Sequence, residues 1–315
     1  MNIPEGFEKL EINTALIIRL MNNWPKRASV RGCYFDEFKS NSNIDPSVPD
    51  YPIELVPFWK HPNFEKVDEE IKFKILTWGW ITYNKRTIHA EEKIVNPSFD
   101  LIIQDTFKGT DQDDLKNVVH QSLIDERFHS MMHFNAMCMT KKFRALSEQI
   151  LLPDSVTYRH LQKHQNDEPE KWKQALMILA CGIVSETSIN AFLSLLSKST
   201  DVQPQHAYIS KLHDIDEFAH SSILVEIAKC VYIHFDKKQK DFFVRYLPKA
   251  MNAFCIQDFS SWKTILDHYK IKNSDNIIGD CEVDASKAKL VNDYSGLRRL
   301  TEELNISKEI DFDFN

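Results

Sequence analysis

Glycine is scarce in this chain, and its glycines stand alone. Only 7 of the 315 residues are glycine. They occur at Gly6, Gly32, Gly79, Gly109, Gly182, Gly279 and Gly296. This spacing forms neither the GxGxxG turn that binds a dinucleotide nor the GxxxxGK[ST] loop that binds nucleoside phosphates. Two-residue β-hairpin turns also depend on glycine, so the scarcity counts against an all-β chain. We therefore expect a mainly helical protein without a nucleotide-binding loop.

The charge and cysteine content exclude several classes of function. A formal net charge of −7 gives no support for a nucleic-acid-binding surface. The six cysteines include no CxxC pair, so neither a zinc knuckle nor a redox dithiol is indicated. The N-terminal residues lack the basic segment of a secretory signal, and the longest apolar run, 175–184, is too short to span a bilayer. We expect a cytoplasmic protein that contacts neither nucleic acid nor membrane.

Apolar periodicity and the prolines that interrupt it divide the chain into helices. Five prolines between residues 41 and 64 exclude a continuous helix there and predict an extended surface segment. Long helices are predicted over 65–95 (stopped by Asn96-Pro97), 111–146, 169–197 and 204–235. Shorter helices are predicted over 13–24 (ended before Pro25), 238–257, 259–270 and 283–304, whereas 151–167 is predicted to be loop-like, with a short helix as the alternative. This order predicts one all-α domain, 1–315, built as a helical bundle with additional C-terminal helices.

A carboxylate in the third long helix needs a partner. Glu186 lies midway along a segment that is apolar on nearly every face. Burial of an unpaired carboxylate is costly, so the side chain would need a cation, a proton or a metal ion. The alternative is that it emerges on a narrow polar stripe with Ser185, Thr187 and Asn190.

The fourth long helix carries a metal-ligand pattern. His213, Glu217 and His220 are related by i, i+4 and i+7, which places them on one helical face. Two imidazoles and a carboxylate on one face offer lone pairs to a shared point. Glu226 lies on the opposite side of the helix and is predicted to be solvated.

The first two long helices supply further candidates. Glu126 and His129 form an ExxH pair in the second, like Glu217 and His220 in the fourth. ExxH alone is a weak signal because such pairs arise by chance, but both of these lie mid-helix in different helices. His133, one turn further on, is predicted to be a satisfied core histidine. Near the end of the first helix, only one residue of the pair Glu91-Glu92 can face inward.

Together these residues match a recurring ligand set. A Glu from each of two helices, with ExxH from each of two others, holds the metals of carboxylate-bridged di-iron and di-manganese bundles. Four carboxylates would balance the charge of two divalent ions. The set here comprises Glu91, Glu126, His129, Glu186, Glu217 and His220, with His213 as an additional candidate.

This constellation resembles the non-haem di-iron arylamine N-oxygenases. A third histidine one turn before the last ExxH separates that family from ferritins and methane-monooxygenase-like proteins, and here it is His213. The spacing from Glu91 to the later ligands is similar to the family's, which favours Glu91 over Glu92. The resemblance implies a dimeric, ferritin-like fold over nearly the whole chain. It also implies oxidation of an amine through hydroxylamine and nitroso to nitro. Two iron ions would use O2, manganese is a candidate substitute, and an external reductase or chemical donor would supply electrons.

The resemblance also implies substrate contacts. It suggests Tyr83, Arg86, Asn190 and Phe192 as pocket residues. Family members that act on a carboxylated aniline use an arginine near the C-terminus, and Arg298 or Arg299 would serve here. The alternative is that both arginines are solvated on a helix surface, so the charge of the substrate is left open.

Other functions are compatible with the sequence. The same ligands would serve a ferritin-like di-iron hydroxylase or desaturase acting on a non-amine substrate, because the ligands determine O2 activation and the pocket determines the substrate. Metal storage in a ferritin-like shell is disfavoured by the added helices and the seventh ligand. A helical interaction protein without metal is the remaining alternative, and metal analysis would test it.

Overall fold

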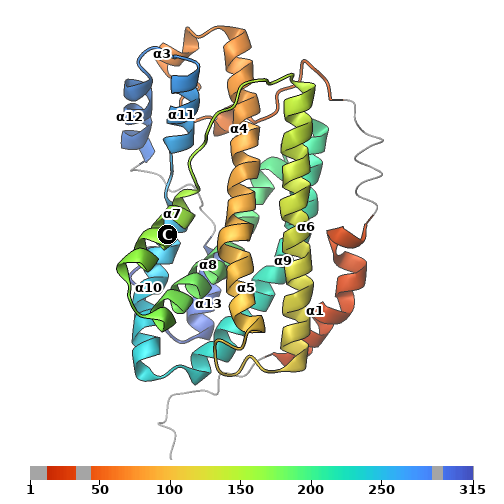
Figure 1. The fold of residues 1–315 in the computed structure, drawn as a ribbon, viewed down its shortest axis with the longest axis vertical. Coiled ribbons are helices and arrows are strands. Elements are labelled where there is room, and N and C mark those ends of the chain that lie inside the picture. The colour runs from red at the N-terminus through yellow and green to blue at the C-terminus, as the bar shows by residue number, and fades with distance from the viewer. Residues whose placement is uncertain (1–12, 33–43, 286–293, 315) are drawn as a thin grey trace, which may run out of the picture.

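Four long helices form the centre of the molecule. The computed structural model describes residues 13–32, 44–285 and 294–314, except for the side chains of 190–192, and this part of the chain contains helices and no strand. In Figure 1, α4 (Glu69–Ala90) and α6 (Asp113–Phe143) stand in front of α8 (Lys171–Ser197) and α9 (Pro204–His234). The all-α prediction is confirmed. Around these helices lie α1 (Thr14–Arg27), η1 (Ser29–Arg31), η2 (Ile53–Leu55), α3 (Pro62–Glu65), α5 (Asn96–Ile103), α7 (Val156–Asp167), α10 (Lys237–Cys255), α11 (Ser260–His268), α12 (Ser274–Ala285) and α13 (Ser295–Glu303).

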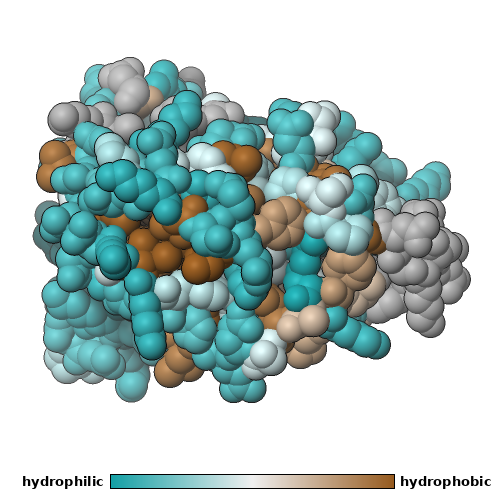
Figure 2. Space-filling model, turned by 90° about the horizontal axis from the view of Figure 1, so that it is seen from above, coloured by the Kyte–Doolittle hydropathy of each residue, from teal (hydrophilic) through white to brown (hydrophobic). Residues whose placement is uncertain are grey.

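Helix α8 is the core helix of the bundle. By length and composition it could cross a bilayer, but 87% of that stretch is buried inside the protein. A helix that is apolar on every face is buried wherever it occurs, and here α5, α9 and α10 cover it. Viewed from the top of Figure 1, the surface is mainly hydrophilic around a hollow that exposes apolar side chains (Figure 2).

The first long helix does not stop at Asn96-Pro97 as predicted. A π-helical turn, η3 (Glu91–Val95), joins α4 to α5, and the amide of Asn96 donates to the carbonyl of Glu91. Pro97 has no N–H, but it lies in the first turn of α5, where proline is tolerated. Single π-helical turns often occur at functional sites, and this one carries Glu91.

Helix α1 continues through Pro25 to Arg27, contrary to the predicted end before that proline. Pro25 cannot donate to the carbonyl of Met21. The side-chain amide of Gln121, from α6, donates to this carbonyl instead at 3.4 Å. A tertiary contact therefore compensates for the missing backbone hydrogen bond.

The described part of the proline-rich segment, 44–64, lies only partly on the surface, where the sequence predicts a surface segment. Asp50, Phe58 and Phe64 are all fully buried within it. Asp50 accepts hydrogen bonds from Thr77 and Arg144, which satisfy its charge inside the protein. The prolines prevent a long helix, as predicted, but the aromatic side chains between them pack into the core.

Three further predictions need correction. Residues 156–167 form α7, so the short-helix alternative for 151–167 holds. The expected helix 283–304 is divided between the end of α12 and α13, while 286–293 lie outside the described residues. Glu226 is buried, not solvated, because α1 and α13 cover that face of α9. It pairs with Lys229 at 3.0 Å and accepts the Asn13 amide at 2.7 Å.

Candidate metal centre

The seven predicted ligands meet in the middle of the bundle, and all are buried. The π-helical turn η3 supplies Glu91, and α8 supplies Glu186. The remaining carboxylates and imidazoles come from α6 and α9. Since each helix stays regular around its ExxH pair, the carboxylate and the imidazole of a pair face the same point. Those residues are Glu126, His129, His213, Glu217 and His220.

The ligand atoms form two groups that share one carboxylate. Glu91, Glu126, His129 and His213 make the first group, and Glu126, Glu186, Glu217 and His220 make the second. Within each group all ligand atoms lie within 4.8 Å of one another. Glu126 belongs to both groups, so its carboxylate would help to hold either ion.

Glu217 also reaches both groups. Its Oε1 lies 2.9 Å from His213 Nε2 and 3.5 Å from His129 Nδ1, both in the first group. The same oxygen lies 3.4 Å from Nδ1 of His220 in the second group. Two carboxylates, Glu126 and Glu217, thus lie between the two candidate ion positions.

Two buried aspartates orient two of the imidazoles. Asp216 Oδ2 lies 3.1 Å from His129 Nε2, and Asp125 Oδ2 lies 3.2 Å from His220 Nε2. A carboxylate at Nε2 favours the tautomer with the proton there and leaves Nδ1 to bind a metal ion. Each aspartate precedes a ligand glutamate on one helix and holds the histidine of the other helix.

A different chain of hydrogen bonds orients His213. Asn84 Nδ2 donates to the carbonyl of Trp80, so Asn84 Oδ1 accepts from His133 Nδ1 at 2.8 Å. Burial lowers the pKa of His133 well below its usual range, so its ring is neutral at pH 7. His133 Nε2 then accepts from His213 Nδ1 at 2.9 Å, and His213 Nε2 faces the carboxylates. His133 is a satisfied core histidine, as predicted, and it also fixes the ring of a candidate ligand.

The centre has many buried polar atoms without a hydrogen-bond partner. Both side-chain oxygens of Glu126 and one oxygen each of Glu91, Glu186 and Glu217 belong to this set. Nδ1 of His129 and of His220 also belong to it. Uncompensated buried polar groups are costly, and metal coordination is one of the ways in which proteins compensate them. The chemistry and position of these atoms fit two divalent cations.

The buried carboxylates of the centre shift one another's pKa values. Burial, together with the neighbouring Glu126 carboxylate, raises the pKa of Glu91 well above its usual value. Burial and the carboxylates of Glu217 and Glu126 raise the pKa of Glu186 in the same way. These carboxyl groups repel one another in the absence of cations, so positive charge at the centre would stabilise their ionised forms.

The structure distinguishes Glu91 from Glu92. Glu91 is buried and accepts a hydrogen bond from Ser130 at 2.9 Å, with its other oxygen 3.3 Å from His213 Nε2. Glu92 points outward and pairs with Arg127. Only Glu91 lies in a ligand group.

Sequence reasoning missed Asp125 and Asp216, although a signal for them exists. Ile-Asp-Glu-x-x-His occurs twice, at 124–129 and 215–220. The repeated Asp before each ExxH pair marks the two residues that orient the histidines. Arg27, from α1, was also missed; it donates to Asp216 at 2.7 Å and lies 3.5 Å from Asp125.

Comparison with known proteins agrees with this geometry. The family model for P-aminobenzoate N-oxygenase AurF matches residues 13–305. The chain belongs to the AurF family. The 4-aminobenzoate N-oxygenase of Streptomyces thioluteus is 39% identical to it over 309 residues, which cover 98% of this chain and 91% of the relative. The predicted membership in a family of N-oxygenases is confirmed.

Two of the predicted substrate contacts share a cavity in this AurF-family chain. Tyr83 and Arg86 both line a small cavity of about 80 Å³ beside Gly79 and Trp262. Tyr83 is buried, its hydroxyl lies 3.3 Å from Ser210 Oγ, and its ring packs edge-on against His133. Side-chain contacts therefore lead from the cavity wall at Tyr83 through His133 to His213 of the metal centre.

Neither of the two predicted C-terminal arginines lines that cavity. Asn190 and Phe192 lie on α8, but their side chains are outside the described residues. Arg299 lines a different cavity of about 670 Å³, between α8, α9 and α13, and pairs with Glu303. Arg298 is exposed and donates to the carbonyl of Phe314, which fits the surface alternative.

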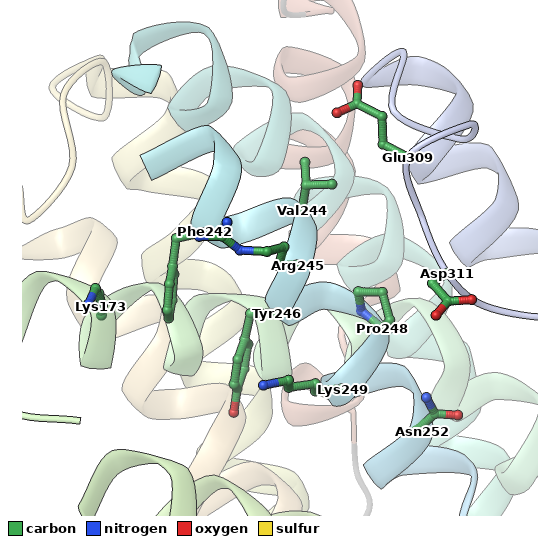
Figure 3. A pocket seen from close by; sticks show the side chains of 10 residues that line it. All are labelled: Lys173, Phe242, Val244, Arg245, Tyr246, Pro248, Lys249, Asn252, Glu309 and Asp311. Carbon is green, nitrogen blue, oxygen red and sulfur yellow. The ribbon is translucent and has the colours of Figure 1, made fainter. Parts of the chain in front are cut away.

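A further cavity of about 620 Å³ lies between α10 and the chain after α13 (Figure 3). Phe242 and Tyr246 stack at its edge, with ring centroids 5.9 Å apart. The cations of Arg245 and Lys249 share it with carboxylates from the C-terminal segment. None of the seven predicted metal ligands lines it, so it is separate from the metal centre.

Proposed function

We propose that this chain is a di-iron N-oxygenase that uses O2 to oxidise an arylamine, through hydroxylamine and nitroso, to a nitro product. The observation that carries the proposal is the pair of buried ligand groups joined through Glu126 in a member of the AurF family. The Streptomyces thioluteus relative is a 4-aminobenzoate N-oxygenase, which supports an aromatic amine as the substrate.

Seven side chains would hold the two ions. One ion would be held by Glu91, Glu126, His129 and His213. The other would be held by Glu126, Glu186, Glu217 and His220. Iron bound there would supply the binding and reduction of O2 and the transfer of oxygen to the amine nitrogen. Manganese is a candidate substitute, because carboxylate and imidazole ligands also suit it.

The rest of the chain prepares the ligands for this role. Asp125 and Asp216 keep a proton on Nε2 of the ExxH histidines, and neutral His133 keeps one on Nδ1 of His213. Outer-shell partners of this kind fix ring orientation and raise ligand basicity. The burial of every ligand also excludes bulk water from the reacting atoms.

We propose that the amine enters beside Tyr83 and Arg86. Tyr83 lines this cavity and packs against His133, which contacts His213, and an aromatic wall suits an aromatic ring. Because the glycines form no nucleotide-binding loop, we propose an external reductase or chemical donor as the electron source. We further propose that the protein acts as a homodimer in the cytoplasm.

Metal loading and product analysis test the function together. The purified protein is loaded with Fe²⁺ without oxygen, its metal content is measured, and it is mixed with ¹⁸O2 and a panel of amines with and without a carboxylate. We expect about two irons per chain and labelled hydroxylamine, nitroso or nitro products by mass spectrometry. If the protein oxidised a lipid or carbon acid and none of the amines, this would instead indicate the hydroxylase or desaturase alternative. A protein that takes up no metal would refute both.

A further inference from the structure

Helix α1 brings an indole ring to the outer edge of the metal centre. Trp24 Nε1 lies 3.0 Å from each carboxylate oxygen of Asp125. Asp125 in turn lies 3.2 Å from Nε2 of His220, whose Nδ1 faces the ligand carboxylates. Asp125 and His220 are fully buried, whereas Trp24 is half-buried. A continuous line of hydrogen bonds thus connects the protein surface with a candidate metal ligand.

The aspartate that orients the other ExxH histidine has different hydrogen-bond partners on its outer side. Asp216, which orients His129, accepts from the guanidinium of Arg27 and from the backbone amide of Ser29. Neither partner carries an aromatic ring. Of the two aspartates, only Asp125 has an indole as its outer partner, although a methionine or phenylalanine in place of Trp24 would fill the same apolar space. The indole N–H therefore requires an explanation beyond packing.

The charged side chains of α1 and η1 are all basic. Residues 13–32 contain no aspartate or glutamate, although the whole chain has a net charge of −7. The guanidinium of Arg31 lies 5.9 Å from the Trp24 ring centroid. Arg19 and Lys26 are exposed on the same helix. Basic side chains on one helix of an acidic protein favour association with an acidic partner at that helix.

We propose that α1 is the docking surface of an acidic one-electron donor protein, and that Trp24, Asp125 and His220 form the route by which its electrons reach the metal pair. Electrons tunnel more readily through covalent and hydrogen bonds than across gaps, and this route contains only such links. The proposal rests on the proposed di-iron function. A reduced [2Fe–2S] cluster of the donor is oxidised by one electron in each transfer. Two transfers reduce two ferric ions to ferrous, and no bond is formed or broken in the protein.

The rate of reduction tests the route. The probe is a reduced plant-type [2Fe–2S] ferredoxin, mixed anaerobically with the ferric protein while both chromophores are followed by stopped flow. Trp24→Phe keeps an aromatic ring but removes the N–H, and we expect it to slow reduction by roughly tenfold or more, within the range of effects known for outer-shell partners. Trp172→Phe is the matched control, because Trp172 is also half-buried and donates to a carboxylate, that of Glu170, outside the metal centre.

Dithionite and metal content separate the route from other causes. The small reductant needs no docking surface, so it should reduce wild type and Trp24→Phe at equal rates, and both proteins should hold equal amounts of iron. Equal reduction of both by ferredoxin would overturn the route. Unequal reduction by dithionite, or lower iron content in the variant, would assign Trp24 a structural role instead and also overturn it. Failure of wild type to take up iron would refute the proposed function itself.

Binding to the metal-free protein tests the docking surface independently of turnover. We expect ferredoxin to bind by calorimetry with an affinity that falls as salt rises, because exposed charges are screened. The double variant Arg19→Glu/Lys26→Glu should weaken this binding, whereas Lys163→Glu, which reverses an exposed charge on α7, should not. Equal affinities for the two variants would place the donor elsewhere on the protein.

Discussion

At the scale of single residues, His206 shows how the fold holds a polar side chain outside the metal centre. Its Nε2 lies 3.1 Å from Asp50, and its ring stacks on Trp80 with centroids 4.0 Å apart. Its Nδ1 is buried without a hydrogen-bond partner. Burial lowers the pKa of His206 more than the Asp50 carboxylate raises it. The folded protein therefore disfavours protonation of this ring.

This shift predicts a loss of stability in weak acid. The unfolded histidine has a pKa of about 6.5, and the folded one is lower, so between these values the unfolded chain binds more protons. The contribution of His206 is complete above about pH 7 and is lost as pH falls below about 6.5 towards the folded pKa. We expect the free energy of unfolding, measured with urea on the metal-free protein, to fall less between neutral and weakly acidic pH in His206→Gln than in wild type. The exposed His120→Gln variant should behave like wild type; an equal loss in all three proteins would contradict the prediction.

At the residue scale, the sequence indicates positions where a helical pattern repeats, and it does not indicate positions that tertiary contacts decide. Helical spacing places His213, Glu217 and His220 on one face, and Glu126 and His129 on another, and the structure brings these residues together. Glu186 stands out by its apolar surroundings, and the family resemblance favours Glu91 over Glu92. Glu226 follows the same spacing outward, yet it is buried because α1 and α13 cover it and Lys229 compensates its charge. No local pattern reports which helix covers a given face. The same limit applies to Arg27, which reaches Asp216 across 189 residues of sequence.

At the scale of elements, Gly182 sets the distance between α8 and α5. A Cβ atom at this position would lie 2.2 Å from Ser98 Oγ and 2.5 Å from Ser98 Cβ. Real side chains do not approach so closely, so only glycine permits this contact. Gly182 precedes Glu186 by one turn of α8, and Ser98 follows the π-helical turn that carries Glu91, so this contact influences how the two ligand carboxylates face each other.

Gly182→Ala is expected to destabilise the protein by about 1–3 kcal/mol, because overpacking forces neighbouring backbones apart. Chemical denaturation measures the change. Gly279→Ala is the matched control: it lies in α12 with nothing within 4 Å of the added Cβ, so alanine should be neutral or stabilising by up to about 1 kcal/mol. Equal changes in the free energy of unfolding for the two substitutions would contradict the prediction that the close approach of α5 and α8 excludes a side chain at residue 182.

Element boundaries were the least predictable part of the fold. Proline marks a missing donor, but it does not say whether another group compensates for it. Gln121 compensates at Pro25, and the π-helical turn places Pro97 where no donor is required. Both helices therefore continue past the residues at which local rules end them. The order of the long helices was predicted because it depends on hydrophobic periodicity over many residues.

At the scale of the whole molecule, one centre connects separate parts of the chain. The ligands come from η3, α6, α8 and α9, and α1 contacts their outer aspartates. Without cations, the centre gathers four carboxylates in a buried space, and burial with mutual repulsion raises the pKa of Glu91 and Glu186. The scarcity of glycine suits this architecture, since ligand spacings of three, four and seven residues require uninterrupted helices.

Metal loading is therefore expected to stabilise the entire bundle. Ions that bind only the folded state add about 2.7 kcal/mol per site when free metal is 100 times its dissociation constant. Two sites would raise the melting temperature by roughly 5 °C or more, which calorimetry with anaerobic Fe²⁺ measures. Uptake should also release protons, because raised carboxyl pKa values leave protons for the metal to displace. A chelator should reverse the shift, and His220→Ala should reduce it. An unchanged melting temperature in wild type, with no protons released, would show that these buried carboxylates do not bind metal.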